Sequence, residues 1–95
     1  YTTLFRSGVY ATRVTFENGE SRPAVTNIGV RPTVDDGDRV TVEGFILDFQ
    51  GDLYGQTVRM EFYKRLRGER KFPSLEALKD EVMRNAEQTR AYFST

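Results

Sequence analysis

The 95-residue sequence contains no cysteine and no histidine. The absence of cysteine excludes disulfides, thiolate metal sites and cysteine nucleophiles. The absence of histidine removes the most common general base and the most common zinc ligand. Any proton transfer near neutral pH must therefore fall to Asp, Glu, Lys or Tyr side chains.

The sequence also lacks an excess of either charge. It has 14 basic and 14 acidic residues, so no net field would attract nucleic acid or an anionic membrane. No apolar run approaches the roughly 20 residues of a membrane span, and no secretory signal is visible. We therefore expect a cytoplasmic protein without a nucleic-acid or membrane partner. The length allows one small domain of limited stability.

The first seven residues, Tyr-Thr-Thr-Leu-Phe-Arg-Ser, read like an in-frame translation of a common sequencing-library adapter. We interpret residues 1–7 as non-native and exclude them from reasoning about the fold. The alternative is a natural N-terminus that frays. On the first interpretation the native gene continues upstream, and residues 8–95 are the C-terminal part of a domain.

Alternating apolar residues predict four β-strands, at residues 9–16, 22–30, 39–49 and 56–66. The Asn18-Gly19 pair predicts a hairpin between the first two strands. Arg31-Pro32 should end the second strand, because proline cannot donate to a ladder. Polar and glycine-rich turns are expected at 33–38 and 50–55. Gly44, within the third strand, indicates a bulge or a close backbone approach.

A helix is predicted after Pro73. Ser74 is a good N-cap, and Glu76 lies in the first turn, where the helix dipole favours a negative charge. Apolar positions recur at helical spacing and should pack on the sheet: Leu75, Leu78, Val82, Ala86, Thr89 and Phe93. The fold class is therefore mainly β with a C-terminal helix. Four antiparallel strands close a barrel poorly, so closure would need further strands.

The most informative motif is Thr-Val-Glu-Gly-Phe-Ile-Leu-Asp-Phe at 41–49, followed by Gly-Asp-Leu-Tyr-Gly at 51–55. Other stretches agree with the same family: Gly-Val-Tyr-Ala at 8–11, Asn-Ile-Gly-Val-Arg-Pro-Thr at 27–33, Leu-Arg-Gly-Glu-Arg-Lys-Phe at 66–72 and Ser-Leu-Glu-Ala-Leu-Lys at 74–79. In the order and spacing of these motifs, the chain resembles the riboflavin kinase family over residues 8–93.

The resemblance implies a small Greek-key antiparallel β-barrel with a C-terminal helix. It implies transfer of the γ-phosphoryl group of ATP, with Mg²⁺, to the 5′-hydroxyl of riboflavin, which gives FMN. In bacteria such a domain usually forms the C-terminal half of a bifunctional FAD synthetase, whose N-terminal half is an FMN adenylyltransferase. The expected partners are therefore riboflavin, ATP and that second domain.

The resemblance assigns roles to particular residues. Glu43 matches the catalytic glutamate, and a positioned carboxylate can take the proton of a weakly nucleophilic hydroxyl. Three residues around the following turn match nucleotide contacts: Ile46, Asp48 and Tyr54. Three residues before the helix match the segment that closes over the flavin, where an aromatic face suits the isoalloxazine: Arg65, Arg67 and Phe72.

Each assignment has a plainer alternative. Glu43 can be a solvent-facing strand residue, Asp48 a carboxylate that starts a turn, and Tyr54 a core or rim aromatic. The two arginines can form a solvated basic strand end next to a core Phe72. Asn27 could support the site from the neighbouring strand, although an ordinary strand amide is the simpler interpretation.

The sequence also departs from the family pattern. The glycine-rich flap and the Pro-Thr-Ala-Asn motif, on which the ATP and Mg²⁺ site rests, are absent, and both belong upstream of Gly8. We do not assign Mg²⁺ to Thr33. Phe45 stands where many members have histidine, and Asn85 stands where many have aspartate. We therefore expect no metal site in this chain, with the Mg²⁺ ligands upstream, and no kinase activity from these residues alone.

Two other functions remain as alternatives. One is a non-catalytic β-barrel that binds flavin or a partner protein on the same scaffold. The other is an OB-like barrel that binds nucleic acid, which the balanced charge disfavours. Unpaired strand edges should in any case make the domain marginally stable.

Overall fold

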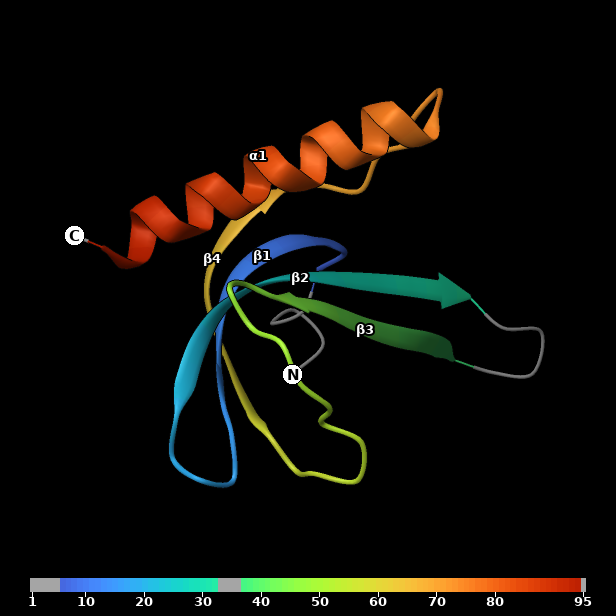
Figure 1. The fold of residues 1–95 in the computed structure, drawn as a ribbon. Coiled ribbons are helices and arrows are strands. Elements are labelled where there is room, and N and C mark those ends of the chain that lie inside the picture. The colour runs from blue at the N-terminus through green and yellow to red at the C-terminus, as the bar shows by residue number, and fades with distance from the viewer. Residues whose placement is uncertain (1–5, 33–36, 95) are drawn as a thin grey trace.

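The computed structural model describes residues 6–32 and 37–94. Its strands are β1 (Gly8–Thr15), β2 (Ser21–Pro32), β3 (Asp38–Ile46) and β4 (Arg59–Arg67), and α1 (Leu75–Phe93) follows them (Figure 1). The four strands form one antiparallel sheet in the order β3-β2-β1-β4. The first three strands are sequential neighbours and the fourth returns to lie beside the first, which is the Greek-key order. The predicted fold class is confirmed.

The sheet curls but does not close. β3 and β4 are its two edges, and within the described residues no ladder joins them. Tyr10 and Phe62, on the adjacent strands β1 and β4, pack edge to face with ring centroids 5.4 Å apart, and the two edge strands approach each other at Gly44. A Cβ added to Gly44 of β3 would lie 3.3 Å from the Cε of Met60 on β4. The expectation that four strands close a barrel poorly fits this open sheet.

The hairpin and the turns follow the local sequence signals. Gly19 has φ +92°, which suits glycine, and Phe16 donates its N–H to the Glu20 carbonyl at 2.8 Å. β2 runs to Pro32, two residues beyond the predicted end at residue 30, and Arg31 and Pro32 still pair with β3. β3 ends at Ile46, three residues earlier than predicted, because the chain turns at Leu47 and Asp48, where Asp48 has φ +54°. The predicted turn at 33–38, with Thr33, lies largely outside the described residues.

Gly44 causes no bulge. It pairs in register with Thr26, and the β2–β3 ladder is regular on both sides of it. The register shifts lie instead between β1 and β4, next to Val9 and Ala11. The bulge alternative for Gly44 is therefore wrong, and the atoms nearest to a Cβ placed there belong to the side chains of Met60 and Thr26, at 3.3 and 3.5 Å, and not to a neighbouring backbone.

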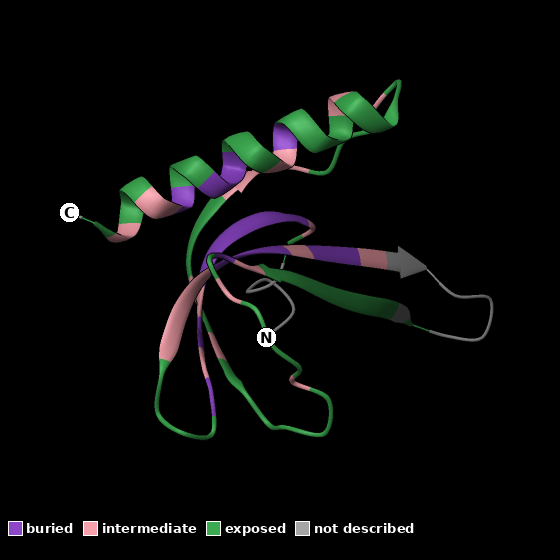
Figure 2. Ribbon diagram, viewed as in Figure 1, coloured by how far each residue is buried: buried purple, intermediate pink, exposed green. Residues whose placement is uncertain are grey.

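The helix begins as predicted, because the Ser74 Oγ accepts a hydrogen bond from the Ala77 N–H at 3.1 Å. It crosses the convex face of the sheet, and its buried residues lie on the side that faces the strands (Figure 2). One core cluster fills this interface: Val9, Val25, Leu47 and Ala86, with Leu66 packed against them. A second cluster lies around Val14, Phe16 and Ala24 on the concave side.

The predicted apolar stripe of the helix is correct only in part. Ala86 and Thr89 are buried, but Leu75 is 79% exposed. The buried positions of α1 begin at Glu81, so its first turns reach past the packed part of the sheet. Two polar residues, Glu81 and Asn85, take buried positions that hydrophobic spacing alone would not assign to them.

Candidate functional site

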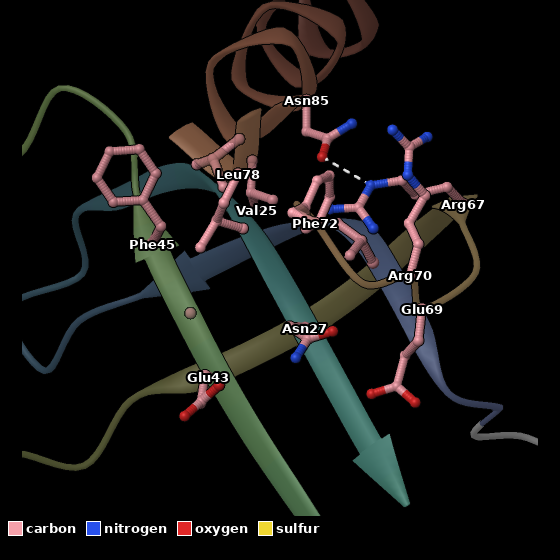
Figure 3. Close-up of a pocket in the computed structure, with 13 residues that line it drawn as sticks. Val25, Asn27, Glu43, Phe45, Arg67, Glu69, Arg70, Phe72, Leu78 and Asn85 are labelled. Atoms are coloured by element: carbon pink, nitrogen blue, oxygen red, sulfur yellow. Dashed lines mark hydrogen bonds between the residues drawn. The ribbon is translucent and has the colours of Figure 1, made fainter. Parts of the chain in front are cut away.

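A pocket of about 490 Å³ lies between the sheet, the β4–α1 loop (residues 68–74) and the helix. This volume falls within the range of about 300–1,000 Å³ that is typical of small-molecule sites. Figure 3 shows its lining, which comes from β1–β4, the loop and α1: Val9, Val25, Asn27, Glu43, Gly44, Phe45, Arg67, Glu69, Arg70, Phe72, Leu78, Val82 and Asn85.

The open end of the pocket is polar. Glu43 of β3 and Asn27 of β2 are direct partners in the antiparallel ladder, so their side chains share one face of the sheet. Both lie away from the helix in Figure 3, and Glu43 is exposed. The strand alternation also places Phe45 on this face, opposite Val25. The Glu43 carboxylate therefore stands at the mouth of the pocket, within reach of a ligand that enters from solvent, and Glu69 of the loop also extends to this end (Figure 3).

The other end of the pocket is apolar and lies beneath the helix. Val25, Leu78 and Phe72 gather there (Figure 3). The guanidinium carbons of Arg67 and Arg70 lie 5.4 and 5.0 Å from the centroid of the Phe72 ring, which is the range of cation–π attraction. The pocket thus offers an aromatic and aliphatic lining flanked by two guanidiniums beneath the helix, and the polar side chains of Asn27 and Glu43 at its mouth.

Glu81 organises the basic residues beside this apolar end. Its carboxylate lies 3.2 Å from Arg67 Nε, 3.8 Å from an Arg70 nitrogen and 2.9 Å from an Arg84 nitrogen. Asn85 Oδ1 also accepts from Arg67 Nε at 3.1 Å. The hydrogen bond from Arg84, with the neighbouring guanidiniums, holds the pKa of Glu81 below its usual value, although burial opposes this. Burial is the main cause that lowers the pKa of Arg67, and Glu81 opposes it.

Sequence reasoning missed Glu81. Its position three residues after Leu78 and four before Asn85 places all three on one side of the helix. One sequence signal could have identified Glu81. It is a carboxylate on the predicted buried side of the helix, and several arginines precede it in the sequence. Asn85 carries no charge where aspartate is frequent in the family pattern, and the carboxylate that faces Arg67 here comes from Glu81, about one turn earlier.

The structure brings together some of the predicted site residues and separates others. Glu43, Arg67 and Phe72 all line the pocket, and so does Asn27. Arg65 does not line it, because its guanidinium donates to the Ser7 carbonyl at 2.7 Å. Ile46 packs against the concave-side cluster. Tyr54 lies in the β3–β4 connection with 96% of its surface exposed.

Asp48 forms an ion pair with the helix. Its two carboxylate oxygens accept from Arg90 Nε at 3.2 Å and from a terminal Arg90 nitrogen at 3.1 Å. This hydrogen bonding is the main reason that the pKa of Asp48 is lowered and the pKa of Arg90 is raised. The pair links the turn after β3 to the end of α1.

We expect Asp48→Asn to lower the Tm slightly, with the difference shrinking in about 1 M salt because the pair is exposed to solvent. Since the folded-state pKa of Asp48 is depressed, the pair stabilises above the ordinary carboxylate pKa and its contribution is lost as the pH falls through the lower folded value. Thermal melts at several pH values and salt concentrations measure this. Asp80→Asn, at an exposed helix position, is the control, and an equal salt-dependent shift in both variants would contradict the expectation.

Comparison with known proteins decides the family. A family model described as riboflavin kinase matches residues 1–93. The chain belongs to the riboflavin kinase family. The match begins at residue 1, and the interpretation of residues 1–7 as non-native stays a prediction.

The relatives of this family member are longer proteins. Bifunctional riboflavin kinase/FMN adenylyltransferases are 44% identical in Pseudomonas fluorescens and 39% identical in Haemophilus influenzae, over 90% and 93% of this chain. A protein named RNA-binding riboflavin kinase, from Bacillus subtilis, is 38% identical over 84% of the chain. The chain spans only 27%, 28% and 34% of these three proteins.

A solved structure has the same fold. It is described as the crystal structure of a macrolide-efflux protein from Streptococcus pneumoniae, and it matches with a TM-score of 0.81 and 33% identity. The similarity covers 88% of this chain and 27% of that one. The efflux in that description concerns the Streptococcus pneumoniae protein alone.

Among the described residues, no group of three or more His, Cys, Asp or Glu side chains is arranged to hold a metal ion. In the part of the chain that the structure describes, no helix is long and apolar enough to cross a membrane.

Proposed function

We propose that this riboflavin kinase family member binds riboflavin in the pocket and supplies the base for phosphoryl transfer from ATP to the riboflavin 5′-hydroxyl. One observation carries the proposal. The Glu43 carboxylate stands at the polar mouth of a pocket whose other end is lined by Phe72 and aliphatic side chains. This polarity matches riboflavin, which joins a flat aromatic ring system to a chain of hydroxyl groups.

The geometry gives each end of the pocket a separate role. The apolar end binds the isoalloxazine by burying its faces, with Phe72 as an aromatic wall. Arg67 and Asn85 supply polar groups at the edge of that wall. The ribityl chain then extends toward β3, where Glu43 accepts the proton of the terminal hydroxyl as the bond to phosphorus forms. ATP supplies the phosphoryl group as the second substrate.

We also propose that the β3–β4 connection, residues 47–58, carries the nucleotide contacts. Tyr54 has an exposed ring that could stack on an adenine base. The Tyr54 N–H donates to Asp52 Oδ1 at 2.9 Å, which orders the turn that presents this ring. Ile46 and Asp48 flank the start of the connection, although Asp48 must share its carboxylate with Arg90.

Riboflavin binding is tested by titrating the chain into riboflavin and following flavin fluorescence. We expect Phe72→Ala to weaken binding by about tenfold or more, because an aromatic wall contributes roughly 1 kcal/mol beyond its buried area. Tyr54→Ala, at an exposed position outside the pocket, should leave riboflavin binding unchanged. Equal affinities for both variants would remove Phe72 from the flavin site.

A non-catalytic barrel that binds flavin on the same pocket is the second candidate. This non-catalytic function predicts that riboflavin binding depends on Phe72. It also predicts that no longer form of the protein produces FMN. Turnover that depends on Glu43 would exclude it.

A further inference from the structure

We propose that Glu81 is a positioning residue that holds the β4–α1 loop against the helix and so fixes Phe72 in the pocket wall. Only the expected effect on riboflavin binding rests on the proposed function. The ion pairs that hold the loop are present in the chain whether or not it binds riboflavin. Glu81 is not assigned to any contact with the substrate.

The position of Glu81 is unusual for a carboxylate. Its side chain is only 8% exposed, and it faces three guanidiniums from three parts of the chain. Arg67 is the last residue of β4, Arg70 lies within the loop, and Arg84 lies on the helix itself. One carboxylate on α1 therefore connects the helix to the end of β4 through Arg67 and to the loop through Arg70.

These ion pairs differ in their burial. Arg84 is 61% exposed and bonds Glu81 within one helical turn, so this ion pair does not connect the loop to the helix. Arg67 is 16% exposed, so the loss of its anionic partner leaves a guanidinium with little access to water. Arg70 is 53% exposed and reaches Glu81 from the loop at 3.8 Å. The tie between strand, loop and helix thus depends mainly on Arg67 and Arg70.

The same two arginines contact Phe72. Their guanidinium carbons lie within 5.4 Å of the ring centroid, and the ring lines the pocket. Removing the charge of Glu81 frees Arg70 from the helix and leaves Arg67 held there by its hydrogen bond to Asn85, so the ring loses part of what fixes its place. Phe72 and its loop should sample more conformations, which lowers affinity for a ligand that needs the ring in one place.

The test compares Glu81→Gln with Glu87→Gln. Both substitutions remove one negative charge from α1, but Glu87 is exposed and pairs with Arg90 within the last turns of the helix. The first readout is limited trypsin digestion of the folded chain, with each cut identified by mass spectrometry. We expect Glu81→Gln to accelerate cleavage after Arg70 and Lys71 at least about fivefold, while sites in the sheet, such as Arg13, stay protected. Glu87→Gln should match the unsubstituted chain.

The second readout is riboflavin affinity. We expect Glu81→Gln to raise the Kd about tenfold, because a hydrogen-bonded charge is lost behind the aromatic wall, and Glu87→Gln to leave it unchanged. If Glu81→Gln does not fold, Arg70→Gln carries the test, since Arg70 is half-exposed and its loss leaves the Arg67–Glu81 pair in place. Because this variant has no trypsin site at residue 70, it should show faster cleavage after Lys71 and a smaller rise in Kd.

The possible outcomes distinguish the positioning role of Glu81 from the proposed riboflavin site. Loop cleavage and affinity that are the same in Glu81→Gln and Glu87→Gln would overturn the positioning role. Cleavage that rises at every site alike would also overturn it, because that result indicates general destabilisation. If the unsubstituted chain binds no riboflavin, the proposed flavin site fails, while the digestion pattern still decides whether Glu81 holds the loop.

Discussion

Replacing Glu43 with glutamine should lower FMN formation by about 10²–10⁴-fold, the usual contribution of a general base. The amide keeps the size of the side chain but cannot accept the proton of the 5′-hydroxyl. Because Glu43 is exposed at the mouth of the pocket, the substitution should leave the fold and riboflavin affinity nearly unchanged. A loss in turnover without a loss in binding is the signature of a group that acts on the reacting atoms.

The measurement requires a protein that can bind ATP. Residues 8–95 can be joined behind the corresponding upstream part of the Pseudomonas fluorescens relative, and FMN can be separated by chromatography after incubation with ATP, Mg²⁺ and riboflavin. Glu61→Gln is the matched control, because Glu61 is an exposed strand glutamate of β4 outside the pocket. Unchanged turnover in the Glu43 variant would remove that residue from its role. FMN formation by the 95 residues alone would contradict the expectation that this chain is inactive without upstream residues.

Replacing Leu47 with alanine should destabilise the domain by about 2–5 kcal/mol, as is typical of buried Leu→Ala substitutions. Leu47 has no exposed surface and packs with Val9, Val25 and Ala86 where the helix meets the sheet. Its backbone N–H, which donates to the Pro23 carbonyl at 2.9 Å, is retained in the variant. The loss is therefore one of packing and cavity formation, without a lost hydrogen bond.

In a domain of this size that loss corresponds to a fall in Tm of roughly 10–30 °C. Thermal denaturation followed by circular dichroism measures it. Leu75→Ala is the matched control, because Leu75 is 79% exposed in the first turn of the helix, and it should change stability by less than about 0.5 kcal/mol. Comparable destabilisation by both substitutions would contradict the assignment of the core to Leu47.

The candidate site was predictable where it depends on a single strand. Alternation along β3 places Glu43 and Phe45 on one face, and the family motif around them assigns the base. The position of Arg65 could not be read in this way, because register shifts between β1 and β4 change the face that each β4 residue presents. Asp48 likewise has a local role as a turn residue, but its partner Arg90 lies 42 residues away in the sequence.

The sequence by itself determined the elements of this protein and their class. Strand alternation, the Asn-Gly hairpin, the proline at the end of β2 and the Ser74 cap are local preferences, so neighbouring residues suffice to predict them. Only the tertiary structure decided which face of α1 is buried, that Leu75 is left in solvent, and that Glu81 meets Arg67 and Arg70 behind Phe72. These features arise from contacts between segments far apart in the chain, where burial and charge pairing outweigh the local pattern.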